Sequence, residues 1–69
     1  MPLPPEILES IKTKIDDAEA KIASVEDVIT DLRATGIDAS KQAEKLDALK
    51  EELRHLRLFY GKQRKRLEG

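Results

Sequence analysis

Two apolar stripes run through this chain, and their positions mirror each other about the middle of the sequence. Members of each stripe are separated alternately by 3 and 4 residues, which is the spacing of one face of an α-helix. When the stripes are paired in opposite directions, the positions of facing residues add to 74 or 75. The pattern predicts two antiparallel helices that meet along one seam. The seam residues are Leu8, Ile11, Ile15, Ala18, Ile22, Val25, Ile29 and Leu32, and, on the second stripe, Gln42, Leu46, Leu49, Leu53, Leu56, Tyr60, Gln63 and Leu67.

The segment between the stripes carries the signals that end one helix and begin another. Gly36 suits the left-handed position just past a helix end, and Ile37 can pack back on Leu32 as the apolar contact of a Schellman motif. Asp38 is a suitable N-cap for the helix that follows. A connection this short favours an antiparallel neighbour. One straight helix through Gly36 is the competing interpretation.

Proline and glycine indicate how far each helix extends. Pro5 suits the first helical position, because its missing N–H has no partner there in any case. Gly61 costs a helix interior about 1 kcal/mol relative to alanine, yet seam residues continue beyond it, so we expect the second helix to continue as well. The expected organisation is a single helical hairpin over 1–69, with helices at about 5–34 and about 39–68 and a turn at 35–38.

Charged residues beside the seam test this register independently, because flanking positions meet across an antiparallel coiled coil. Exposed ion pairs are worth about 0 to 1 kcal/mol each, so they select a register more than they stabilise it. The expected fold class is all-α, an antiparallel two-helix coiled-coil hairpin. Three attractive pairs are expected, Glu19 with Arg57, Glu26 with Lys50 and Lys21 with Glu52, and one adverse pair, Lys12 with Arg64.

A chain of 69 residues arranged as two helices buries little apolar surface, and its core alone leaves it marginally stable. Some large apolar residues also lie outside the seam. Pairing of two hairpins into a four-helix bundle would cover such residues, so a homodimer is the favoured prediction. A lone hairpin and a different helical partner are the alternatives. The candidate partner face consists of Ile7, Val28, Leu58 and Phe59.

The composition offers little material for catalysis. The chain has no cysteine and one histidine, His55, which is too few ligands for a zinc site. Carboxylate pairs at helical spacing, such as Asp16 with Glu19, are expected on solvated faces, whereas a catalytic pair needs burial or a charged neighbour to shift its pKa. Nucleotide-binding glycine patterns and nucleophile motifs are absent from the sequence. We expect no catalytic residues, no metal, no cofactor and no small-molecule substrate.

Basic residues gather near the end of the chain. Residues 50–69 hold 7 bases against 3 acids, whereas residues 1–49 hold 11 acids against 6 bases. A basic helix end beside an aromatic residue could bind the phosphates of a nucleic acid. In the alternative interpretation, the same bases form ion pairs with the acids of the first helix. The candidate phosphate contacts are Arg54, Arg57, Lys62, Arg64, Lys65 and Arg66.

The sequence therefore predicts a non-enzymatic protein–protein interaction module that self-associates. A small nucleic-acid-binding hairpin is the alternative. The longest apolar run is three residues, so no membrane span is expected. The lack of cysteine and of a leader pattern favours the cytoplasm.

Overall fold

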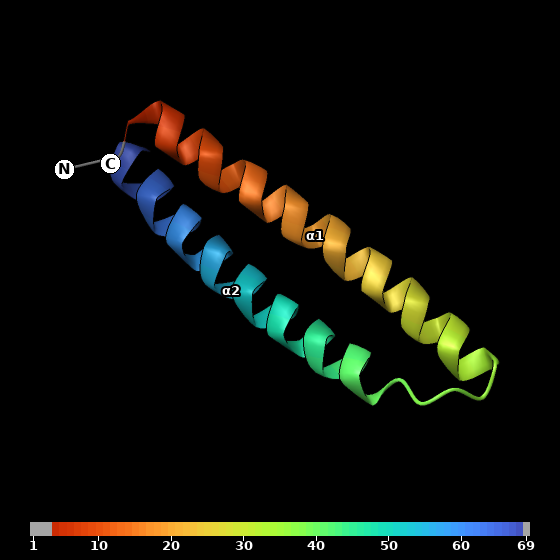
Figure 1. Cartoon of the computed structure of the whole chain (residues 1–69). Helices are drawn as coiled ribbons and strands as arrows, with labels where there is room; N and C mark the ends of the chain where they lie inside the picture. The colour runs from red at the N-terminus through yellow and green to blue at the C-terminus, as the bar shows by residue number, and fades with distance from the viewer. Residues whose placement is uncertain (1–3, 69) are drawn as a thin grey trace.

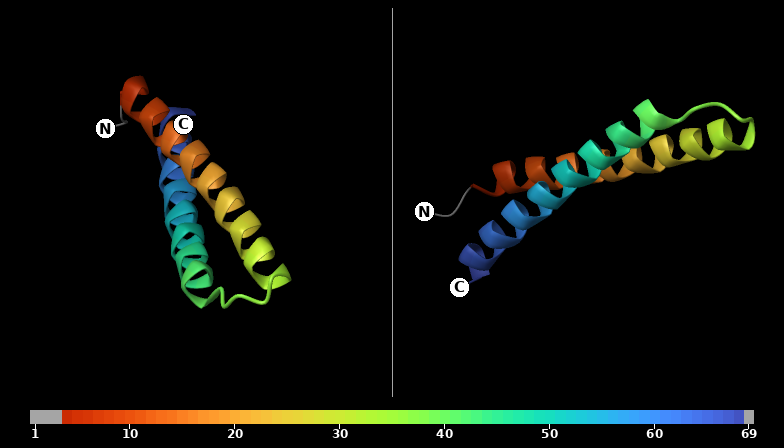
Figure 2. Two further views of the ribbon diagram at one scale, coloured as in Figure 1. Left: turned by 45° about the vertical axis from the view of Figure 1, so that its right-hand side comes forward. Right: turned by 90° about the horizontal axis from the view of Figure 1, so that it is seen from below.

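A computed structural model describes residues 4–68, and the side chains of residues 4–66. The chain forms two helices, α1 (Pro5–Ala34) and α2 (Ser40–Glu68), that lie antiparallel and pack along their length (Figure 1). The start of α1 and the end of α2 lie at the same end of a rod measuring 52 × 15 × 13 Å. Figure 2 shows that the helices cross at an angle. The all-α hairpin is confirmed, and the single straight helix is excluded.

The core lies along the predicted seam. Every seam residue with a described side chain is buried or half-buried, whereas Leu67 lies outside the described side chains. Among residues 4–66, only Ala39 and Ala43 join the seam residues in being less than fully exposed. The smallest seam residue of α1, Ala18, packs with bulkier side chains of α2. The central cluster consists of Ile15, Ala18 and Leu53, packed against Ile11, Ile22, Leu56 and Tyr60.

One seam residue is polar and buried. The side chain of Gln63 is 8% exposed, and its Oε1 accepts no hydrogen bond from any described group. Leaving a buried amide oxygen without a donor costs about 1 to 3 kcal/mol. Gln63 therefore occupies its place in the seam at an energetic cost, which is a feature of residues that determine the register of helix pairs.

A Schellman motif ends α1, as the sequence predicts. Gly36 has φ of +75°, in the left-handed region. The Ile37 N–H donates to the Leu32 carbonyl at 2.8 Å, and the Gly36 N–H donates to the Arg33 carbonyl at 3.2 Å, which are the two bonds of the motif. The Ile37 side chain stays 55% exposed. The hydrogen bonds, more than an apolar contact, therefore hold this end of the helix.

The Asp38 carboxylate accepts hydrogen bonds at the start of α2, but Ala39, whose carbonyl accepts the first helical bond, occupies the N-cap position predicted for Asp38. Asp38 Oδ1 accepts hydrogen bonds from the Ser40 N–H at 3.2 Å and the Ser40 hydroxyl at 2.6 Å. The helix begins at Ser40, one residue later than expected. The reason is that the first helical backbone bond runs from the Ala43 N–H to the carbonyl of Ala39, which leaves Ala39 outside the helix as a buried residue of the turn.

Gly61 lies inside α2, and the helix continues through it to Glu68, as predicted. A methyl group added at Gly61 would meet no atom within 4 Å. Packing within the hairpin therefore does not require this glycine, and its effect there is a loss of helix propensity.

Replacing Leu53 by alanine tests the seam. Leu53→Ala should lower the free energy of unfolding by about 2 to 5 kcal/mol, because it opens a cavity in the central cluster. Leu58→Ala is the matched control, since Leu58 is in the same helix but 53% exposed, and it should change stability by less than about 0.5 kcal/mol. Urea unfolding followed by circular dichroism measures both. Equal effects at the two sites would contradict the seam.

The two described glycines should respond in opposite directions to alanine. Gly36→Ala should lower the free energy of unfolding by about 1 to 2 kcal/mol, because a Cβ is strained at positive φ. Gly61→Ala should raise it by about 1 kcal/mol through helix propensity alone. The measurement is the urea midpoint of each variant. A destabilising Gly61→Ala would show that this glycine has a packing role.

The hydrogen bonds at Asp38 should make stability depend on pH. Hydrogen bonds from the Ser40 hydroxyl and N–H lower the pKa of the Asp38 carboxyl from 3.8. A lowered pKa in the folded state adds stability that is present above the unfolded pKa and is lost as pH falls through the folded one. Asp38→Ala should therefore lower the thermal midpoint at neutral pH, and its difference from wild type should shrink below about pH 4. A difference that persists at acidic pH would argue against a stabilising role for these hydrogen bonds.

Candidate interaction surfaces

The four apolar residues proposed as a partner face are all exposed. Leu58 and Val28 are 53% and 48% exposed, and Ile7 and Phe59 are only slightly less so. Leu58 and Phe59 nevertheless do not share one face, because successive residues of a helix point about 100° apart. They line different grooves, one on each side of α2. The structure therefore divides the expected face into two surfaces.

The first surface, here called the Leu58 side, is a groove of about 480 Å³ between the helices. Seam residues form its floor, Leu58 lies at its outer edge, and its polar walls are entirely basic. The residues that line it are Ile22, Lys50, Leu53, Arg54, Arg57 and Leu58.

The second surface, here called the Phe59 side, is a run of four adjoining grooves. It begins near the turn at Val28 and continues across Leu49 to Phe59 on α2. Neighbouring grooves share residues, so the surface is continuous along most of the rod. The residues shared between neighbouring grooves are Ser24, Val25 and Lys45, then Lys21 and Leu49, then Glu52.

Ile7 belongs with the Phe59 side by its place in the helix. It precedes Lys14, Lys21 and Val28 at steps of seven residues, and positions seven apart lie nearly in line on a helix. The three later members of this line all border the Phe59 grooves. The structure therefore places Ile7, Val28 and Phe59 on one side of the hairpin and Leu58 apart from them.

Two of the three predicted ion pairs form across the seam. Arg57 donates to Glu19 Oε2 at 2.9 Å, and Lys50 Nζ lies 4.0 Å from Glu26 Oε2. The third expected pair, Lys21 with Glu52, is wrong for the described side chains, since the two border the same groove without an ion pair within 4.0 Å. Lys21 and Glu52 thus remain available to a partner.

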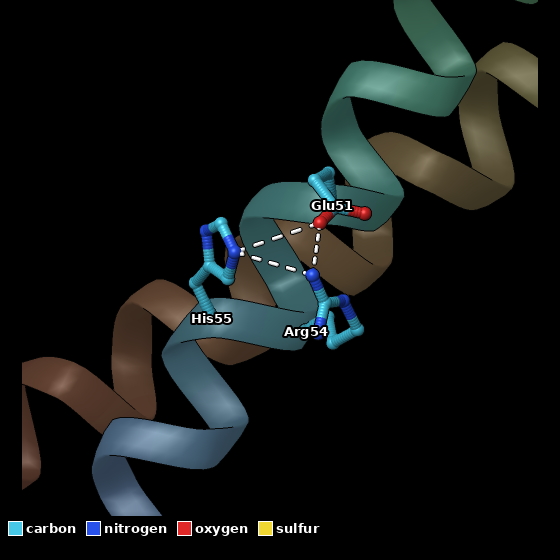
Figure 3. Close-up of polar contacts among 3 residues, drawn as sticks. All are labelled: Glu51, Arg54 and His55. Atoms are coloured by element: carbon cyan, nitrogen blue, oxygen red, sulfur yellow. Dashed lines mark hydrogen bonds and ion pairs between the residues drawn. The ribbon is translucent and has the colours of Figure 1, made fainter.

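A polar cluster lies on α2 opposite the seam (Figure 3). Arg54 donates to the Glu51 carboxylate, and His55 Nε2 lies 3.5 Å from the same oxygen. The Arg54 hydrogen bond and charge lower the pKa of the Glu51 carboxyl, and Glu51 in turn raises the pKa of Arg54. All three side chains are more than half exposed, which makes the cluster a surface ion-pair network.

The candidate phosphate contacts divide into two sets. Arg54 and Arg57 are held by carboxylates of the hairpin, and the Arg64 guanidinium lies over the Tyr60 ring, 5.9 Å from its centre. The other three, Lys62, Lys65 and Arg66, are exposed. Half of the predicted phosphate-binding set is therefore already engaged within the chain.

Further features of the described part of the chain concern metals and membranes. Among residues 4–68, no three His, Cys, Asp or Glu side chains gather closely enough to ligate a metal ion. Neither α1 nor α2, over the same range, has an apolar stretch that could cross a bilayer.

Comparison with known proteins adds no relative. No protein-family model, curated protein sequence or solved structure matches the chain.

Proposed function

We propose that this chain is a non-enzymatic protein–protein interaction module that self-associates through its Phe59 side. Two copies pack these sides together as a homodimer, and the four helices form a bundle with coiled-coil packing at each seam. The observation that carries the proposal is the continuous groove surface on the Phe59 side, with Val28 and Phe59 exposed along it.

The thin core supports a second layer of packing. No described side chain is fully buried, because each seam residue has only one helix to pack against. Burying a large apolar side chain is worth about 1.5 to 3 kcal/mol, so covering Val28 and Phe59 and completing the burial of Leu49 adds stability that a lone hairpin lacks. A four-helix bundle is the usual way in which helical hairpins gain this burial.

Charges on the Phe59 side fit a symmetric pair. Lys21 and Glu52 border the same groove and form no ion pair in the hairpin. In a two-fold dimer with α1 of one copy beside α2 of the other, each Lys21 faces Glu52 of the second copy, so the contact occurs twice. Lys14 and Lys45 can lay their methylene stems over the apolar floor and keep their ammonium groups in water.

The test is the double variant Val28→Ser/Phe59→Ser. At about 1 M salt, where exposed charges are screened, light scattering should give wild type a mass twice the 7.8 kDa of the chain. The variant should give the mass of one chain and keep its helical circular dichroism.

The matched control is Leu58→Ser, an exposed apolar residue on the opposite groove, which should leave the dimer intact under these conditions. A monomeric wild type, or a dimer that survives the double substitution, would refute the Phe59 interface.

A further inference from the structure

Leu58 stays exposed when two copies pair through their Phe59 sides, because it lies on the other groove, among basic residues. Three basic residues and no acid line the groove around Leu58. Leu58 is also the most exposed described large apolar residue of α2. Each of these bases already pairs with a carboxylate of the hairpin, so Leu58 is an isolated apolar residue beside ion pairs whose basic members border the groove. A partner that covers Leu58 needs a small apolar site with acids placed to meet basic groups.

The outer face of each helix is defined by the seam, because residues two positions before or after a seam residue lie about 200° around the helix. On α2 from Arg54 onward, this outer face holds no acid among the described side chains. Its members are Arg54, His55, Leu58, Gly61, Lys62 and Lys65, all exposed. Lys62 and Lys65 take part in none of the ion pairs formed by the described side chains.

The outer face of α1 has the opposite character. Every charged residue on it is acidic, and its other members are alanines, serines and threonines. The middle of the face is Ala20, an exposed small residue that follows seam residue Ala18 by two positions and precedes Ile22 by two. The acids are Glu6, Glu9, Asp16, Asp17, Asp27 and Asp31.

The two outer faces match position by position when Leu58 is placed over Ala20 and the helices run in the same direction. Arg54 and Asp16 both lie four residues before these centres, and His55 and Asp17 both lie three before. Lys65 and Asp27 both lie seven residues after, about 10.5 Å along each axis. Gly61 then meets Ala23, so the backbones can approach closely. In the opposite direction Glu51 would meet Asp27, which is repulsive.

We propose that the Leu58 outer face of α2 binds the acidic outer face of α1 in a second copy of this chain. Because the two outer faces point away from each other in the hairpin, this contact does not close on itself and adds copies in an open series. The inference rests on the proposed role in self-association. It centres on Leu58, which lies apart from the Phe59 side, although Ala20, Asp17 and His55 of the outer faces also border grooves of that side. The series is held by exposed charges and is therefore sensitive to salt.

The experiment follows mass against protein concentration by light scattering. At low ionic strength, wild type should grow to at least about twice the mass of the closed dimer, and about 1 M salt should reverse this growth. Leu58→Ser and Lys62→Glu/Lys65→Glu should each abolish the growth. Mass at low ionic strength that does not rise with concentration, or growth unaffected by these substitutions, would overturn the proposal.

Charge-reversal variants of the two outer faces test whether the acidic face of α1 is the surface that binds the Leu58 outer face. Asp16→Lys/Asp27→Lys should also stop growth when alone, and mixing it with Lys62→Glu/Lys65→Glu should restore growth, because the first variant keeps the basic face of α2 and the second keeps the acidic face of α1. Lys12→Glu/Lys41→Glu is the control for Lys62→Glu/Lys65→Glu, because it makes the same change in net charge at exposed sites off both outer faces, and it should still grow. If both variants stop growth but the mixture does not restore it, the acidic face of α1 does not bind the Leu58 outer face.

Failure of the outer-face contact can be distinguished from failure of the Phe59 interface. Circular dichroism checks that each charge variant keeps its helices, and mass at about 1 M salt reports the dimer alone. Loss of the dimer with growth retained rejects the Phe59 interface only. Loss of growth with the dimer retained, in wild type, rejects the outer-face contact only.

Discussion

Burial of one apolar stripe against another is the interaction on which the rest of this hairpin depends. The seam is a single layer of side chains, and it forms only because the spacing of 3 and 4 residues keeps each stripe on one side of its helix. With 29 or 30 residues in each helix, most positions face water and are free to carry charge. The molecule therefore has a narrow core and a large, chemically varied surface.

The helices and their turn could be predicted because each depends on local rules. Alternating apolar spacing gave the seam, and the glycine and aspartate of the turn gave the helix ends. The start of α2 was expected one residue early, since the sequence shows that Asp38 can cap but not that Ala39 is buried in the turn. Such differences depend on tertiary packing that local signals do not contain.

The interaction surfaces could be predicted only in part. Exposure of Ile7, Val28, Leu58 and Phe59 follows from their places outside the seam, but the separation of Leu58 from Phe59 depends on helix phase. That signal is present in the sequence, because adjacent residues of a helix diverge by about 100°. The missing contact between Lys21 and Glu52 has a different cause, since long exposed side chains gain too little from pairing to be fixed by backbone register alone.

The mirror symmetry of the seam also bears on how the hairpin folds. Facing residues near Gly36 are close in the sequence, as Leu32 and Gln42 are, whereas Ile11 and Gln63 at the open end are far apart. Since the entropy lost on closing a loop grows with its length, contacts beside the turn form with the smallest loss of chain entropy. Contacts further from the turn then form in order toward the open end. The hairpin thus has low contact order, which is typical of fast folders.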